Sequence, residues 1–213
     1  MSRERQISDR TRQTKKRDAS LIIIATEGQE TEKIYLDDLA RYFDNTKVKV
    51  RVITKGTNSN PRARLAELNE FKKTYKAGPI DQLWLVIDRD RWSAEEIADV
   101  HTLCRQKRYQ IAMSTPCFEL WLLLHLKDWA EYTEFEINSM AENKHVSNEK
   151  TWLKAELSRL LNGFSVSSYD TKKLLPQVIT AIDRARALDQ NTALRQKLHT
   201  QVYLLIEQIL PVM

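Results

Sequence analysis

Apolar and polar residues alternate along the first 127 residues in patterns that predict strands and helices in turn. Two short runs of consecutive apolar residues, 21–25 and 83–87, are typical of strands covered on both faces of a sheet. Residues 48–52 alternate valines with basic residues, which predicts a half-exposed edge strand, and residues 109–114 form a fourth predicted strand. Helices are predicted between and after these strands, over residues 32–44, 61–76, 93–106 and 117–127.

Start signals support three of these helices. Asn60-Pro61 combines a capping side chain with a proline in the first turn. Ser93 and Glu96 have the spacing of a capping box, in which each side chain accepts a hydrogen bond from a main-chain amide of the other. Thr115-Pro116 is predicted to cap the strongly apolar helix that follows it.

Beyond residue 127 the strand patterns stop and helical periodicity continues. Residues 129–162 predict two helices and residues 163–168 a loop. Amphipathic helices are predicted over 170–189 and 192–210.

The order of these elements predicts an α/β fold with a parallel sheet flanked by helices and a helical C-terminal subdomain. We assign three parts to the chain: a basic flexible N-terminal arm (1–19), an α/β domain (20–127) and a helical C-terminal subdomain (128–213).

Positive charge is concentrated at the N-terminus. The first 18 residues contain seven basic and three acidic residues, while the whole chain has a formal net charge of +5, so the remainder is close to neutral. Such an arm can bind nucleic-acid phosphates by releasing counterions, or it can simply keep the protein soluble. The candidates for phosphate contact are Arg10, Arg12, Lys15, Lys16 and Arg17.

Composition argues against several classes of protein. Cys104 and Cys117 form no C-x-x-C pair, and the four histidines lack the spacing of zinc ligands. The apolar run after the charged N-terminus has only five residues, so we expect no signal peptide, no membrane partner and a cytoplasmic location. The sequence contains no G-x-x-x-x-G-K-[ST] motif, so nucleotide hydrolysis would have to come from a partner chain.

Acidic residues follow both buried strands at the point where each strand ends. Glu27 and Gly28 come after residues 21–25, and Asp88 and Asp90 come after residues 83–87. The carboxyl ends of neighbouring parallel strands meet at one crevice, where carboxylates repel one another unless a cation lies between them. This predicts a Mg²⁺ or Mn²⁺ site completed by nucleic-acid phosphates. Two unrelated polar turns would produce the same spacing.

Other acidic residues lie near these motifs. Glu30 favours the N-terminus of the following helix, whereas Glu32 can serve that role or act as an outer acid of the site. Glu119 lies in the first turn of the apolar helix, where it either caps that helix or provides a fourth acid. His125, at helical spacing from aromatic residues, is interpreted as a hydrogen-bonded core residue.

Two further residues are candidates for nucleic-acid contact. Trp92, two residues after Asp90, can stack on a base or simply pack against the protein. Lys172 can meet a phosphate or belong to a solvated charged surface.

Three segments resemble the RloB-like family: residues 25–32 with Tyr35, residues 85–90, and residues 114–121 continuing to His125. More broadly, the acid-glycine pair and the Asp-x-Asp motif are similar to the Toprim arrangement of topoisomerases, bacterial primases and small nucleases. The resemblance extends from about residue 20 to the C-terminus. One departure is Glu30, which stands where the family's first motif is expected to have a lysine.

The resemblance implies a Toprim-like nuclease encoded with restriction or abortive-infection systems, often beside an ATPase. Glu27, Asp88 and Asp90 would be its metal-binding and catalytic carboxylates, with Glu119 as a further catalytic candidate. The predicted function is metal-dependent hydrolysis of phosphodiester bonds, in RNA such as tRNA or in DNA, in defence against phage. The alternative is an adaptor subunit that works by binding a partner ATPase or nucleic acid.

Overall fold

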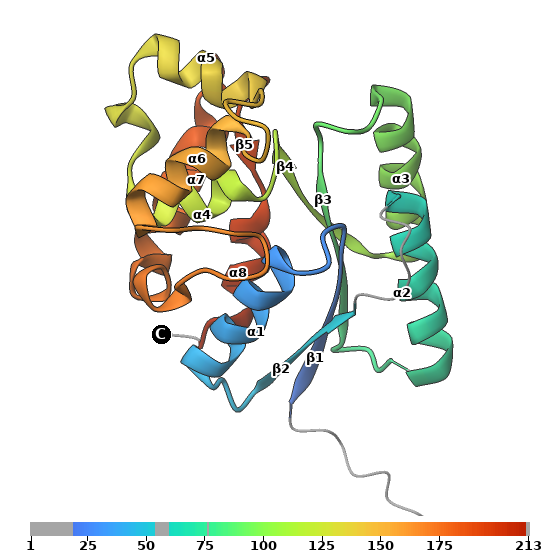
Figure 1. Cartoon of the computed structure of the whole chain (residues 1–213). Coiled ribbons are helices and arrows are strands. Elements are labelled where there is room, and N and C mark those ends of the chain that lie inside the picture. Colours follow the sequence, from blue (N-terminus) through green and yellow to red (C-terminus); the bar gives the residue numbers. More distant parts are fainter. Residues whose placement is uncertain (1–18, 54–59, 76, 212–213) are drawn as a thin grey trace, which may run out of the picture.

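The computed structural model describes residues 19–53, 60–75 and 77–211. In these residues, five strands form one sheet in the order β2-β1-β3-β4-β5 (Figure 1). The strands are β1 (Ser20–Thr26), β2 (Val48–Ile53), β3 (Gln82–Asp88), β4 (Gln110–Thr115) and β5 (His199–Thr200). The first four are parallel to one another, and β5 lies antiparallel beside β4.

Helices cover both faces of the sheet (Figure 1). The described residues form eight α-helices: α1 (Thr31–Phe43), α2 (Pro61–Tyr75), α3 (Ala94–Lys107), α4 (Glu119–Leu126), α5 (Glu134–Glu142), α6 (Trp152–Leu161), α7 (Val178–Gln190) and α8 (Val202–Ile209). Helices α2 and α3 pack on one face, and α1 packs with the C-terminal helices on the other. The predicted α/β class with a helical C-terminal part is therefore confirmed.

Burial on both faces explains the continuous apolar run of β1. Ile22 and Ile24 enter the core shared with α1 and the C-terminal helices, while Ile23 and Ala25 enter the core shared with α2 and α3. By contrast, β2 lies at the edge of the sheet and is mostly half-buried or exposed, as its alternating pattern predicted.

Two of the predicted helix starts are confirmed. The side chain of Ser93 accepts a hydrogen bond from the Glu96 amide, and the Glu96 carboxylate accepts one from the Ser93 amide, which completes the capping box. Asn60 Oδ1 accepts a hydrogen bond from the amide of Arg62, the residue after Pro61. These three bonds satisfy amides that the start of a helix leaves without a partner.

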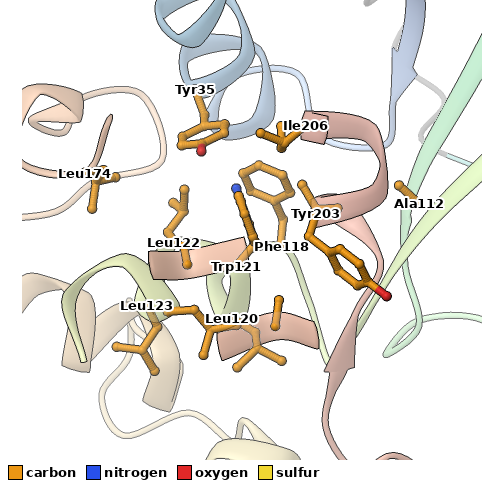
Figure 2. Close-up of a cluster of buried hydrophobic side chains, with 14 of the residues drawn as sticks. Tyr35, Ala112, Phe118, Leu120, Trp121, Leu122, Leu123, Leu174, Tyr203 and Ile206 are labelled. Atoms are coloured by element: carbon orange, nitrogen blue, oxygen red, sulfur yellow. The ribbon is translucent and has the colours of Figure 1, made fainter. Parts of the chain in front are cut away.

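Helix α4 lies at the centre of the larger core. Figure 2 shows Phe118 and Trp121 packed near Tyr35 of α1 and Ile206 of α8. His125 is buried, and its ring nitrogens lie 2.9 Å from the Tyr35 hydroxyl and 2.9 Å from the Trp121 carbonyl oxygen, so its interpretation as a core residue is confirmed. Because α4 is packed on all sides, its first turn is held firmly beside the sheet.

The predicted start of this helix is wrong by two residues. Helix α4 begins at Glu119, and Thr115 provides no capping hydrogen bond because it is the last residue of β4, paired with His199 of β5. The peptide bond between Thr115 and Pro116 is cis. Glu119 is nevertheless in the first turn, as predicted.

The helix that was predicted over residues 170–189 is shorter in the structure. Two 3₁₀ helices, η2 (Thr171–Lys173) and η3 (Leu175–Gln177), precede α7, which starts only at Val178. Pro176 explains the interruption, because proline has no amide hydrogen and disfavours α-helical geometry in the residue before it.

The predicted helix over 192–210 is wrong in its first half. Residues 192–198 turn, β5 pairs with the end of β4, and α8 follows. The Gln201 amide donates to the Met113 carbonyl oxygen, and Ser114 Oγ and Thr200 Oγ1 lie 2.8 Å apart. Pairing at the sheet edge therefore replaces the helical hydrogen bonds of this segment.

Other expectations have mixed outcomes. A third 3₁₀ helix, η1 (Trp129–Glu131), precedes α5, so residues 129–162 contain the two predicted helices and this extra turn. Cys104 and Cys117 are buried free thiols. Within the part of the chain that the structure describes, no helix is both long and apolar enough to cross a membrane. The three-part domain division stays a prediction.

Candidate active site

Strand pairing brings Glu27 and Asp88 together. Strands β1 and β3 are neighbours, with Thr26 opposite Val86, and the Glu27 amide donates to the Val86 carbonyl oxygen at 3.0 Å. The Asp88 amide in turn donates to Glu27 Oε2 at 3.1 Å. The acid that follows β1 and the acid that ends β3 therefore share one end of the sheet, as the sequence predicted.

These residues line a pocket of about 310 Å³ at the carboxyl ends of the strands. Basic residues at its wall are Arg91 and Lys154. Its acidic residues are Glu27, Glu30, Glu32, Asp88, Asp90 and Glu119. The structure thus brings together all four of the predicted catalytic carboxylates, Glu27, Asp88, Asp90 and Glu119, in one place.

Glu27 is held in a defined position. It is only 3% exposed, and its Oε2 accepts a second hydrogen bond from the indole nitrogen of Trp92 at 3.0 Å. Its Oε1 is buried and has no hydrogen-bond partner among the described residues. Trp92 therefore orients a carboxylate of the site, a role that its position in the sequence did not indicate, and its predicted contact with nucleic acid stays a prediction.

Glu32 lines the pocket and also lies in the first turn of α1, so its position agrees with both roles that the sequence left open. It is 4% exposed, and its Oε1 accepts a hydrogen bond from the Gly28 amide at 2.8 Å. A Cβ atom on Gly28 would lie 2.0 Å from Glu32 Oε2, so this position needs glycine to allow the close approach of the carboxylate. Glu30 also lines the pocket, but it is exposed, at the N-cap of α1.

The carboxyl groups raise one another's pKa. Burial raises the pKa of Glu32 to about 7, with further contributions from the charges of Glu119 and Glu27. The pKa of Asp88 is raised well above its usual range, first by burial and then by four neighbouring charges, those of Glu32, Glu119, Glu27 and Asp90. The pocket therefore has an excess of negative charge that a bound cation would relieve.

The C-terminal part of the chain forms one wall of this pocket. The Thr31 hydroxyl donates to the Val166 carbonyl oxygen at 3.1 Å, and the Tyr169 hydroxyl donates to the Thr31 carbonyl oxygen at 2.7 Å. On the other side, the Asn143 amide group donates to Cys117 Sγ at 3.3 Å. The two contacts of Thr31 join residues more than a hundred positions apart, and the contact of Asn143 with Cys117 joins residues 26 positions apart. No local sequence pattern therefore predicts which residues form this wall.

Comparison with known proteins identifies the family. A family model described as RloB-like protein matches residues 22–209. The chain belongs to the RloB-like family. The match includes residues 22–26 of β1, the Asp-x-Asp segment and α6, so the pocket of this RloB-like protein lies within it. No curated protein and no solved structure matches the chain.

The pocket of the RloB-like protein fits a hard divalent cation. Its acidic donors are carboxylate oxygens, one of which, Glu27 Oε1, is buried without a partner among the described residues. Within those residues, no three His, Cys, Asp or Glu side chains already stand in an arrangement that could hold a metal ion. Mg²⁺ commonly uses one or two carboxylates together with water and substrate phosphates, so a smaller set of protein ligands is enough.

The other predicted nucleic-acid contacts lie elsewhere. Lys172 is exposed in η2 and does not line this pocket, so its proposed phosphate contact stays a prediction. The five basic residues of the arm, Arg10, Arg12, Lys15, Lys16 and Arg17, lie outside the described residues.

Replacement of Gly28 by alanine should damage the site while leaving the fold largely intact. The new Cβ would displace the Glu32 carboxylate, so we expect the affinity for Mn²⁺ to fall by about tenfold or more. Isothermal titration would measure this loss. Gly78→Ala is the matched control, since its Cβ would meet Asp81 at an ordinary 3.6 Å. Unchanged Mn²⁺ affinity in Gly28→Ala would contradict this role of the glycine.

Proposed function

We propose that this RloB-like protein is a divalent-metal-dependent nuclease that hydrolyses phosphodiester bonds in RNA, such as tRNA, or in DNA. The observation that carries the proposal is the hydrogen bond from the Asp88 amide to the Glu27 carboxylate. It joins the acids of two neighbouring strands in a single pocket, which Asp90 and Glu119 also line. Such a group of carboxylates suits Mg²⁺ or Mn²⁺ and the chemistry of phosphates.

Each carboxylate has a distinct role in this proposal. Asp88 and Asp90 would hold the ion together with Glu27, whose orientation is set by Trp92 and by the Asp88 amide. Within the described residues these three side chains do not already surround one point, so a bound ion would draw them closer together. When bound, a divalent ion activates water and neutralises charge on a phosphate. Glu119, at the start of α4, is 6% exposed and contributes negative charge to the same pocket.

Family membership supports a role in defence against phage, as the resemblance implies. A cytoplasmic location, expected from the sequence, is part of the same proposal. An ATPase encoded nearby is the expected partner, and it would supply any nucleotide hydrolysis because the chain has no P-loop motif. The basic arm would add a sequence-independent, salt-sensitive contribution to nucleic-acid binding.

Incubation of purified protein with total tRNA and with plasmid DNA, in Mn²⁺ or in EDTA, tests the proposed activity. We expect cleavage of one substrate in Mn²⁺, none in EDTA, and a loss of at least about a hundredfold in Glu27→Gln. Glu95→Gln is the control, because Glu95 is exposed in the first turn of α3 and lies outside the pocket.

The outcomes separate the possible functions. Equal cleavage by all variants would indicate a contaminating nuclease and contradict the proposal. Cleavage that appears only after co-expression with a partner ATPase would favour a partner-activated subunit. Binding of the ATPase without cleavage under any of these conditions would favour the adaptor function.

A further inference from the structure

The two basic residues of the acidic pocket differ in how they are placed. The Arg91 side chain is 65% exposed, and its Nε lies 4.0 Å from Asp90 Oδ1. The Lys154 side chain is 28% exposed and reaches the pocket from α6. A phosphate that approaches Asp88 would meet mainly negative charge from the six acidic residues of the pocket. The Lys154 ammonium group, which is less exposed than the Arg91 side chain, offers this phosphate a positive charge within the pocket.

A rigid helix positions Lys154. Its neighbour Leu153 is fully buried, and the Leu153 amide donates to Asn143 Oδ1 at 3.0 Å. Lys154 lies in the first turn of α6, so packing of this helix sets where its side chain begins. Burial raises the pKa of Asp90, and the charges of Arg91 and Lys154 partly offset this rise.

The ion pair of Lys154 is long. Its Nζ lies 3.7 Å from Glu119 Oε1, which exceeds the length of a hydrogen bond. Two nearby lysines behave differently: Lys150 Nζ donates to Ser158 Oγ at 2.8 Å, and Lys173 Nζ donates to the Leu161 carbonyl oxygen at 2.8 Å. Among the described residues, the Lys154 ammonium group makes this long ion pair, so its N–H groups can donate hydrogen bonds to a ligand.

We propose that Lys154 binds a phosphate group of the nucleic-acid substrate at the mouth of the acidic pocket. This inference rests on the proposed function and deepens it, because it names a substrate contact on α6. Lysine suits this contact as a compact positive charge with three rotatable donors. The C-terminal helical part would then contribute directly to substrate binding, in the same pocket as the acids of the sheet.

Binding of a fluorescently labelled single-stranded oligonucleotide to the full-length protein tests the inference. The affinity is measured by anisotropy at several salt concentrations, with Ca²⁺ in the buffer. We expect Lys154→Ala to weaken binding by about tenfold. The slope of log affinity against log salt should also decrease in magnitude by about 0.7, the value for one phosphate contact on a single strand. Lys154→Arg should restore both quantities.

Lys150→Ala is the matched control. Lys150 lies just before α6 and does not line the pocket, so its loss should leave the salt slope unchanged. Thermal melting of each variant checks the fold, and Lys154→Gln, which keeps the length of the side chain, is measured beside the alanine variant. An unchanged slope in both Lys154→Ala and Lys154→Gln would overturn the inference, as would a failure of Lys154→Arg to restore it.

This measurement is independent of cleavage. An inactive protein in which Lys154→Ala lowers the salt slope would contradict the proposed nuclease function but not the phosphate contact. An active nuclease whose Lys154→Ala variant keeps the full slope would contradict the phosphate contact alone.

Discussion

Replacement of Asp88 by asparagine should abolish nuclease activity and make the metal-free protein more stable at pH 8. Asparagine keeps the shape of the side chain but removes its charge. Burial and four neighbouring carboxylates raise the pKa of Asp88, so a folded protein at pH 8 must either ionise this group unfavourably or keep it protonated. We expect urea unfolding in EDTA to show a higher free energy of unfolding for the variant than for the wild-type protein, and cleavage in Mn²⁺ to fall by at least about a thousandfold.

Addition of Mn²⁺ should make the wild-type protein more stable than the Asp88→Asn variant, the reverse of the order expected in EDTA. The wild-type protein would gain about 2.7 kcal/mol at a metal concentration a hundred times the dissociation constant, while Asp88→Asn would gain little. Asp183→Asn is the control, because Asp183 is exposed on α7 and its carboxylate pairs with Arg186 at the surface. A variant at position 88 that is less stable than wild type in EDTA, or that still cleaves, would contradict the assignment of Asp88.

The stability of the metal-free protein should depend on pH through Glu32. Its pKa is raised from 4.5 to about 7 in the folded state, so the folded protein holds this proton more tightly than the unfolded chain does. The resulting stability is present below pH 4.5 and is lost as the pH rises toward about 7. The rise of the Glu32 pKa from 4.5 to about 7 corresponds to about 3 kcal/mol in the free energy of unfolding.

Comparison of the wild-type protein with Glu32→Gln measures this contribution together with the smaller effect of the Glu32 charge on Asp88, which has the same sign. Glutamine still offers an oxygen to the Gly28 amide, so the free-energy difference between the two proteins should grow in favour of the variant by about 3 kcal/mol from pH 4.5 to 8. His125, whose pKa burial lowers to about 4, acts in the opposite direction between pH 4 and 6.5, but it is present in both proteins and cancels. Parallel stability curves measured by urea unfolding in EDTA would contradict the role of Glu32.

The elements with strong local patterns were predictable. The apolar run of residues 21–25 reports burial on both faces, and β1 is indeed covered on both. The capping box of Ser93 and Glu96 depends on hydrogen bonds within one helical turn, so the sequence was enough to place it. Pro176, whose effect is equally local, could have predicted the late start of α7.

The short strand β5 could not be predicted in this way. Two residues are too few to show any periodicity, and the strand forms because β4 offers an unpaired edge to His199 and Thr200. The same pairing extends β4 to Thr115 and thereby moves the start of α4.

For the candidate site, the sequence by itself determined which acids stand at the ends of buried strands, because the alternation and burial of a strand are encoded locally. Glu27, Asp88 and Asp90 lie at those strand ends, and Glu119 lies in the first turn of its helix, as predicted, while their roles stay predictions. Only the tertiary structure decided that β1 lies beside β3. It also decided that Glu32 turns inward against Gly28, that Trp92 orients Glu27 and that Lys154 completes the wall, since packing between distant segments sets these contacts.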